Sequence, residues 1–202
     1  MSKLLVFEGL DGCGKGTQML LAASFLFELN KEINLYLTRE PTKDFKEIRA
    51  KLSTSTDVNK DGEWYAQMFV ADRKHHLQHY ILPNLERGIE VLSDRYKHST
   101  LAYQQTQGID LNYLLQLHQG LLIPDLTLIF DCPAETAFTR RGKAGATDVF
   151  DKDLQFQENL RKNYLHLSQS LPGEKIVIID GSRTIEETFA QVKTELKIIY
   201  QN

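Results

Sequence analysis

Short apolar runs of strand length recur along the chain, and longer segments of mixed polar and apolar residues separate them. The apolar runs lie at 3–8, 33–38, 89–93, 126–131 and 175–180. The last two are almost continuously apolar, which is typical of strands buried on both faces of a parallel sheet. The segments long enough for helices lie at about 15–30, 63–87, 98–122, 134–141, 150–170 and 184–200. This alternation predicts an α/β fold, a doubly wound parallel sheet of about five strands with helices on both faces.

The pattern continues without a linker rich in Gly, Pro and Ser, and without repeats. A chain of 202 residues has the size of one domain, so we predict a single domain over residues 1–202. Residues 53–62 form a predicted polar loop. Residues at about 140–151 contain Gly142 and Gly145 and form a predicted mobile connection between two helices.

Composition excludes several classes of protein. Apolar residues make up 42% of the chain, and 24 Lys+Arg against 27 Asp+Glu give a formal charge of −3, as in ordinary globular proteins. The longest nearly apolar stretch, Met19 to Phe27, is too short to span a membrane, which needs roughly 20 residues, and no signal peptide pattern occurs. No long Lys/Arg stripe suggests a nucleic-acid partner. The two cysteines, Cys13 and Cys132, fit a reducing compartment, so we expect a cytoplasmic protein.

A glycine-rich motif follows the first predicted strand and leads into a predicted helix. It matches G-x-x-x-x-G-K, the phosphate-binding loop in which backbone N–H groups and a helix N-terminus face phosphate oxygens. Lys15 would reach the β- and γ-phosphates of a nucleotide. The predicted nucleotide-binding residues are Gly9, Leu10, Asp11, Gly12, Cys13, Gly14, Lys15, Gly16 and Thr17.

The residue after Lys15 narrows the class of nucleotide-binding protein. Gly16 stands where Ser or Thr usually holds Mg²⁺, and Thr17 follows, an arrangement that resembles adenylate-kinase-like enzymes. The guanine-reading motif Asn-Lys-x-Asp of GTPases is missing, because residues 59–62 read Asn-Lys-Asp-Gly. The sequence therefore favours a nucleotide kinase that uses ATP and Mg²⁺, with Thr17 and Asp94 as predicted metal ligands, directly or through water.

Charged residues follow two other predicted strands. Asp94 and Arg95 follow the third strand, and Arg39 follows the second. Ligands of such sheets bind beyond the carboxyl ends of the strands, and guanidinium groups bind phosphate in a bidentate manner. Both arginines would therefore serve one phosphate-binding cleft. Asp94 either organises Mg²⁺ or holds an arginine, and taken alone the Asp94-Arg95 pair is equally well a surface ion pair.

Phe69 and Arg73 lie four residues apart in a predicted helix and so share one face of it. A ring and a guanidinium on one face are able to stack on a pyrimidine and to bond its carbonyl edge. An isolated helical Phe, however, is more often a core residue.

These motifs together resemble the thymidylate kinase family of P-loop nucleoside monophosphate kinases. The family signature is met by Asp94, Arg95, Tyr96, Ser99, Ala102, Tyr103 and Gln104, and further matches are 38–41, 69–73 and 124–126. The resemblance covers nearly the whole chain. It implies a P-loop NTPase fold, transfer of the γ-phosphoryl group of ATP to dTMP to give dTDP and ADP, and a homodimer.

The resemblance also implies roles for individual side chains. Phe69 would stack on thymine and Arg73 would contact it, with Thr100 against the base. Tyr103 would lie near the 2′ position of the sugar, and Asp11 would anchor the 3′-hydroxyl, unless it only forms a turn. The full predicted substrate set is Asp11, Arg39, Phe69, Arg73, Arg95, Ser99, Thr100, Tyr103 and Gln104.

A basic cluster of Arg140, Arg141 and Lys143 lies in the predicted connection at 140–151. It is either a solvated loop or a lid that closes over ATP. Gly12 stands where some thymidylate kinases have an arginine, so the chain resembles the bacterial-type arrangement in which the lid supplies it. The predicted catalytic residues are therefore Lys15, Asp94, Arg95 and either Arg140 or Arg141.

The sequence departs from the family pattern at two places, and two other functions are compatible with it. Residues 148–151 read Asp-Val-Phe-Asp where the family often has Asp-Arg-Phe-Glu, and residues 42–43 read Thr-Lys where it often has Gly-Gly. A P-loop kinase for another pyrimidine nucleotide, such as dUMP, would share the phosphate loop. So would a regulator that binds nucleotide without turnover, although Lys15, Asp94 and Arg95 argue against it.

Overall fold

The computed structural model describes residues 2–57, 59–142, 150 and 153–201. These residues contain one five-stranded sheet in the order β2-β3-β1-β4-β5, with every neighbouring pair parallel. The strands are β1 (Leu4–Gly9), β2 (Leu35–Arg39), β3 (Glu90–Asp94), β4 (Leu126–Asp131) and β5 (Ile176–Asp180). The predicted parallel sheet is thus confirmed, and each strand lies close to its predicted position.

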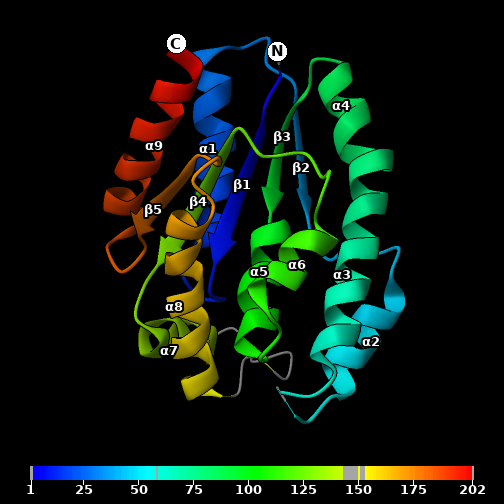
Figure 1. Ribbon diagram of the computed structural model, residues 1–202. Coiled ribbons are helices and arrows are strands. Elements are labelled where there is room, and N and C mark those ends of the chain that lie inside the picture. The colour runs from blue at the N-terminus through cyan, green and yellow to red at the C-terminus, as the bar shows by residue number, and fades with distance from the viewer. Residues whose placement is uncertain (1, 58, 143–149, 151–152, 202) are drawn as a thin grey trace.

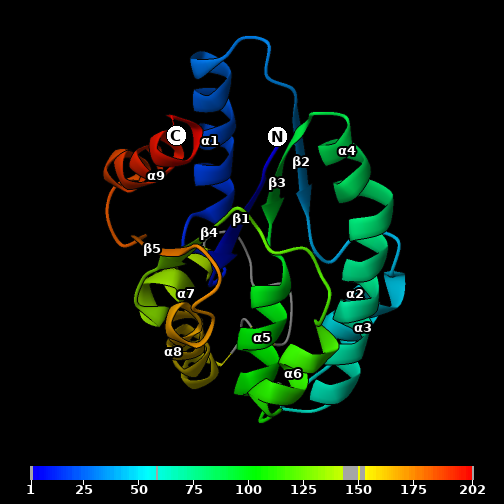
Figure 2. The ribbon, with the colours of Figure 1, turned by 45° about the horizontal axis from the view of Figure 1, so that its top comes forward.

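Helices cover both faces of this sheet (Figures 1 and 2). On one face, α1 (Lys15–Leu29) packs beside α9 (Ile185–Gln201). The other face carries α5 (Lys97–Thr106) packed on α8 (Leu154–Ser170), and α3 (Gly62–His76) packs on α5. The other helical elements are α2 (Lys46–Thr54), the π-helical turn η1 (Leu77–Ile81), α4 (Leu82–Glu86), α6 (Leu111–Leu117) and α7 (Ala134–Gly142).

The sequence of the central strand β1 does not alternate strictly between apolar and polar residues, because both faces of the strand are covered. Leu4 and Val6 join an apolar cluster with Leu77 and Ile81 of η1, whereas Leu5 and Phe7 join the larger core. All six residues of β1 are buried, as expected of a strand covered on both faces. Because all strands run in one direction, their carboxyl ends meet at a single edge of the sheet.

The structure corrects the predicted helix at 98–122, which is wrong as a single element. The chain leaves α5 after Thr106, passes Gly108 with φ +86°, and begins α6 at Leu111, directly after Asp110. The Asp110 carboxylate accepts a hydrogen bond of 3.0 Å from the backbone N–H of Tyr113, which caps α6. A left-handed glycine followed by a capping aspartate separates the two helices.

Two further helical segments differ from the prediction. Residues 46–54 form α2, which went unpredicted because only Ile48 of its residues is buried and its apolar pattern is weak. The predicted helix at 63–87 contains the π-helical turn η1 just before Pro83. Proline has no N–H to continue the α-helical hydrogen bonds, so the turn widens at that point.

The predicted lid at about 140–151 falls largely on residues 143–149 and 151–152, which lie outside the described part of the chain. Lys143 is among them. Helix α7 brings Arg140 and Arg141 up to this segment. Among the helices that the structure describes, none combines the length and the apolar character that a membrane crossing requires. The single domain over 1–202 stays a prediction.

Two leucines of α1 test the packing of this helix. Leu26 is 1% exposed and Leu29 is 45% exposed. Leu26→Ala should lower the free energy of unfolding by about 2–5 kcal/mol, because it leaves a cavity in the core. Leu29→Ala should change it by about 0.5 kcal/mol or less. Urea denaturation measures both, and equal losses would contradict the packing described here.

Candidate active site

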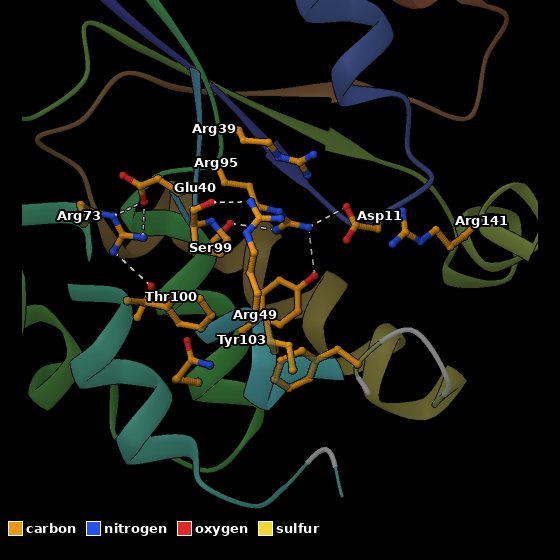
Figure 3. Close-up of a pocket in the computed structure, with 15 residues that line it drawn as sticks. Asp11, Arg39, Glu40, Arg49, Arg73, Arg95, Ser99, Thr100, Tyr103 and Arg141 are labelled. Atoms are coloured by element: carbon orange, nitrogen blue, oxygen red, sulfur yellow. Dashed lines mark hydrogen bonds and ion pairs between the residues drawn. The ribbon is translucent and has the colours of Figure 1, made fainter. Parts of the chain in front are cut away.

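A cavity of about 370 Å³ lies at the carboxyl ends of β1, β2 and β3 (Figure 3). All nine predicted substrate residues line it, although they come from segments far apart in sequence. Arg141 of α7 lines it as well. Among the described residues, the lining consists of Asp11, Arg39, Glu40, Pro41, Arg49, Leu52, Phe69, Arg73, Arg95, Ser99, Thr100, Tyr103, Gln104, Arg141 and Phe150. The structure thus brings the predicted substrate residues together, while their individual roles stay predictions.

The phosphate loop connects β1 to α1 and curls around the side chain of Lys15. This side chain is buried, and its Nζ donates to the backbone oxygens of Gly9 (3.1 Å) and Leu10 (2.9 Å). It also donates to Asp11 Oδ1 at 3.1 Å. An ammonium group has three N–H donors, so a phosphate oxygen that binds Lys15 must replace one of these oxygens.

Gly12 has no room for a side chain. Its φ is +97°, and a Cβ built on it would collide with the backbone carbonyl of Ala137 in α7. An arginine at this position, as the resemblance attributes to some thymidylate kinases, is therefore incompatible with the place of α7 in this structure. Helix α7 packs directly on the phosphate loop.

The two arginines of α7 point to different places. Arg140 donates from Nη1 to the backbone oxygen of Gly181 (2.7 Å) and from Nη2 to that of Ser182 (3.2 Å). It therefore holds the turn that follows β5. Arg141 instead extends toward Asp11 and the cavity (Figure 3). Of the two arginines between which the sequence does not choose, only Arg141 lines the cavity, and the catalytic role of either stays a prediction.

Asp11 lies between several cations. Its Oδ1 is 2.8 Å from Nη2 of Arg95 and 3.1 Å from Nζ of Lys15. Burial by itself would raise the pKa of Asp11, but the charges of Arg95, Lys15 and Arg141 outweigh it and hold this pKa well below its usual range. Asp11 is therefore a carboxylate at any pH used for assays, and it links the phosphate loop to Arg95.

The guanidinium of Arg95 is held from several sides. Nη1 donates to the hydroxyls of Ser99 (3.0 Å) and Tyr164 (3.2 Å), and Nη2 donates to that of Tyr103 (3.2 Å). Burial would lower the pKa of Arg95, but the Asp11 carboxylate raises it well above its usual value. The side chain is therefore a fixed cation at the floor of the cavity.

The backbone at Arg95 is strained, with φ +77°, a region that costs a non-glycine residue of order 1 kcal/mol or more. Hydrogen bonds on both sides hold it. The N–H of Arg95 donates to the oxygen of Phe7 at 3.0 Å, and its carbonyl accepts from the Ser93 hydroxyl at 2.7 Å. This turn directs the side chain from the end of β3 into the cavity.

Beneath Arg95 lies Glu8, a fully buried carboxylate on β1. It accepts from the backbone N–H groups of Tyr96 (2.7 Å) and Ser99 (3.1 Å). It also accepts from the hydroxyls of Ser99 (2.7 Å) and Tyr164 (3.1 Å). Glu8 thereby fixes the start of α5 and two of the hydroxyls that bind Arg95. The sequence analysis missed it, although a charged residue inside an apolar strand was the available signal.

At the other end of the cavity, Arg73 is 1% exposed, and each nitrogen of its guanidinium has a protein partner. Nε and Nη2 each lie 2.7 Å from Oε2 of Glu40, and Nη1 donates to the Thr100 hydroxyl at 3.1 Å. Nη1 also donates to Nε2 of His118 at 2.7 Å. Glu40 in turn accepts from Nδ1 of His76 at 3.0 Å. Glu40 lies in the segment 38–41 that matches the family, but its sequence neighbours do not indicate this pairing with Arg73. Nothing in the local sequence relates His118 to this site.

The remaining walls of the cavity are aromatic and amide side chains. Phe69 is half-buried and stacks on Tyr65, with ring centroids 5.9 Å apart and planes 20° apart. Gln104 is fully buried; its Nε2 donates to Oε1 of Gln107 at 2.9 Å, while its Oε1 has no partner among the described residues. Both side chains line the cavity, and Gln104 does so with an oxygen that no described residue bonds. Phe69 is consistent with either a stacking role or a place at the edge of the core.

The predicted metal ligands, Thr17 and Asp94, do not line this cavity. Thr17 is exposed in the first turn of α1. The Oδ2 of Asp94 is 3.7 Å from Nη2 of Arg39, and its buried Oδ1 has no hydrogen-bond partner in the described part of the chain. An unpaired carboxylate oxygen is the kind of ligand that Mg²⁺ takes in proteins. The residues present therefore fit the ion.

A parallel sheet whose first strand leads through a glycine loop to a buried lysine, and whose cavity at the strand ends is lined with arginines, defines a P-loop nucleoside monophosphate kinase. A family model described as thymidylate kinase matches residues 7–192. The chain belongs to the thymidylate kinase family. The activity predicted from the sequence, transfer of the γ-phosphoryl group of ATP to dTMP, is the activity of this family.

Similar proteins extend over nearly the whole chain. A probable thymidylate kinase of Pyrococcus horikoshii is 38% identical over 198 residues, which cover 96% of this chain and 95% of the relative. One of Thermococcus kodakarensis is 38% identical, with 86% of this chain and 87% of the relative covered. A thymidylate kinase of Carboxydothermus hydrogenoformans is 36% identical, with 95% of each chain covered.

Glu174 gives a pH test of the support behind the site. It accepts from Lys97 Nζ at 2.7 Å and lies 3.0 Å from His98 Nε2, so it secures the first turn of α5. Burial would raise the pKa of Glu174, but these two hydrogen bonds lower it below its ordinary value of 4.5. The carboxylate therefore stabilises the fold above that value, and this contribution is lost as the pH falls through the lowered pKa.

Glu174→Gln should accordingly lower the free energy of unfolding by about 3 kcal/mol at pH 7, because it breaks a buried ion pair. The gap to the unchanged protein should narrow as the pH falls below about 4.5, since the glutamate is then protonated in the unfolded chain. Glu28→Gln, at an exposed position of α1, is the control and should change the free energy of unfolding by about 0.5 kcal/mol or less at pH 7. Urea denaturation at several pH values measures these gaps, and a gap that stays constant down to pH 4 would contradict this account.

Proposed function

We propose that the cavity holds dTMP, with its base toward Phe69 and Arg73 and its phosphate toward Arg95, beside an ATP bound by the phosphate loop. One observation carries this proposal. Lys15, the expected ligand of the ATP phosphates, and Arg95, the expected ligand of the acceptor phosphate, meet on the same oxygen of Asp11 at 3.1 and 2.8 Å. The two phosphate sites are therefore neighbours, as direct transfer between two ligands requires.

The reaction is an in-line displacement without a covalent enzyme intermediate. An oxygen of the dTMP phosphate attacks the γ-phosphorus of ATP, the bond from that phosphorus to the bridging oxygen breaks, and ADP leaves with the electron pair. Catalysis of such transfers is mostly positioning and charge neutralisation. Lys15 neutralises the donor side and Arg95 the acceptor side. Arg141, which extends toward both from α7, is the arginine that closes over the transferring group.

Mg²⁺ is the proposed cofactor, with Thr17 and Asp94 as the residues that would hold it, directly or through water. When bound, the ion supplies positive charge to the phosphate oxygens of ATP. The unpaired Oδ1 of Asp94 supports this assignment. Arg39, which is 62% exposed, lies 3.7 Å from that carboxylate and would serve the same phosphate cleft.

A homodimer and a cytoplasmic location complete the proposal. The resemblance to thymidylate kinases supports the dimer, with the segments around 63–87 and 98–122 as candidate interfaces. Two buried, unpaired thiols, Cys13 and Cys132, support a reducing compartment. Sedimentation of the purified protein distinguishes a dimer from a monomer.

The acceptor is tested by measuring ADP release with ATP and Mg²⁺ in the presence of dTMP, dUMP, UMP, dCMP, AMP or thymidine. We expect a clear preference for dTMP. Turnover with another acceptor would retain the phosphate loop as the ATP site and overturn the assignment of the base end. Binding of ATP without turnover of any acceptor would favour a regulator.

Arginine substitutions test the phosphate sites. Arg95→Ala should lower kcat about a thousandfold, because the acceptor phosphate loses its fixed cation. Arg87→Ala, at an exposed position after α4, is the control and should leave kcat unchanged. An Arg95→Ala variant that retains most of its activity would contradict the proposed acceptor site.

The two arginines of α7 are separable by the same assay. Arg141→Ala should lower kcat about a hundredfold, in the range found when one charge-stabilising donor is lost. Arg140→Ala should lower it less than about tenfold, because this side chain holds the Gly181–Ser182 turn instead. The reverse order of effects would assign the closing arginine to Arg140.

A further inference from the structure

His118 is the C-cap residue directly after α6, and it contacts Arg73 at the base end of the cavity without lining the cavity itself. It is 5% exposed. Its two ring nitrogens have different partners: Nδ1 lies 2.7 Å from the backbone oxygen of Leu114, and Nε2 lies 2.7 Å from Nη1 of Arg73. A carbonyl only accepts and a guanidinium only donates. The ring must therefore be neutral, with its proton on Nδ1 and a lone pair on Nε2.

Charge around the ring favours the same state. The groups that face it are the cations of Arg73 and Lys97, the ring of His98 and the carbonyl of Leu114. Burial and the charge of Arg73 lower the pKa of His118 to about 3, and the hydrogen bond to Leu114 only partly offsets them. His118 is thus a constant hydrogen-bond acceptor over the whole pH range in which the enzyme is assayed.

The N–H groups of Arg73 can be counted one by one. A guanidinium has one N–H on Nε and two on each terminal nitrogen. The Nε–H donates to Glu40, and the two N–H groups of Nη1 donate to Thr100 and His118. Nη2, which lies 2.7 Å from Glu40, has one N–H more than that single contact uses. It is therefore the nitrogen that Arg73 has left for a ligand.

We propose that His118 is a positioning residue of the acceptor site, which takes up the second N–H of Arg73 Nη1 and so directs Nη2 toward the base. Without His118, the guanidinium would be held by Glu40 and Thr100 alone, and its unpaired buried N–H would seek the ligand or water. With His118, Arg73 offers the base a donor at one orientation. This inference rests on the proposed acceptor site and adds a specificity determinant to it.

The chemistry of the base that fits follows from this arrangement. A single N–H donor is satisfied by a ring carbonyl oxygen, as in a keto pyrimidine, and is repelled by the exocyclic amino group of a 4-amino pyrimidine. His118 thus contributes to the choice of dTMP over dCMP, and not to phosphoryl transfer itself. Loss of His118 should act on acceptor binding and on this selectivity.

Three variants test the proposal by steady-state kinetics. His118→Leu removes the acceptor and should raise KM for dTMP about tenfold, leaving kcat and KM for ATP nearly unchanged. It should also reduce the preference for dTMP over dCMP. His118→Gln places an amide oxygen near the former Nε2 and should restore most of both. Leu167→Ala, fully buried in α8 and outside the cavity, is the matched destabilising control and should lower Tm without changing KM.

A purely structural role of His118 would give a different result. His118→Leu would then resemble Leu167→Ala, with a lower Tm and an unchanged KM for dTMP, and His118→Gln would rescue nothing in the kinetics. That outcome would overturn the proposal. So would an equal loss in kcat and in kcat/KM, because it would place the effect on phosphoryl transfer.

A measurement without any substrate separates this inference from the proposed function. Nitrogen-15 NMR of histidine-labelled protein should show His118 as the neutral Nδ1–H form from pH 8 down to about 5. Titration of His118 near its usual value of about 6.5 would show that the contact with Arg73 is missing. If the contact is present but the unchanged protein does not phosphorylate dTMP, the proposed function fails, and the KM of the variants for the acceptor actually used then tests the positioning role.

Discussion

The buried carboxylate of Glu8 is the interaction on which the arrangement of the site depends. It lies on the central strand and accepts four hydrogen bonds from the start of α5 and from Tyr164 of α8. Burying a carboxylate is costly unless its oxygens accept hydrogen bonds. The start of α5 and Tyr164 of α8 must therefore lie next to β1 at this point. The strained turn at Arg95 follows from it, because the next residue along the chain donates to Glu8.

Two carboxylates offset part of the positive charge before any phosphate enters, while the five arginines that line the cavity leave it positively charged overall. Asp11 pairs with both Lys15 and Arg95 between the two proposed phosphate sites, and Glu40 pairs with Arg73 at the proposed base end. Cations held in this way need little reorganisation when a ligand arrives, which is the basis of electrostatic catalysis. The same pairs keep positively charged side chains buried at an acceptable cost.

At the base end, one charged and two neutral side chains together hold the guanidinium of Arg73. Glu40 fixes the plane of Arg73 by charge, whereas Thr100 and His118 take up particular N–H groups. The charge provides most of the interaction energy and the neutral acceptors provide direction. In the proposed acceptor site, selectivity for a base would therefore depend in part on His118, which does not line the cavity.

Local pattern in the sequence determined the strands, the phosphate loop and the set of residues at the strand ends. Apolar runs and glycine spacing act over a few residues, and parallel strands must place Arg39, Asp94 and Arg95 at one edge. The break between α5 and α6 also has a local signal, Gly108 followed by the capping Asp110, which the predicted helix at 98–122 overlooked. Tertiary structure alone decided the separate directions of Arg140 and Arg141 and the partners of Glu8 and His118. These depend on contacts between residues far apart in the chain, such as the 45 positions between Arg73 and His118. Burial also decides the charge state and the hydrogen-bond partners of side chains such as Glu8 and His118. The sequence around a residue does not reveal whether it is buried.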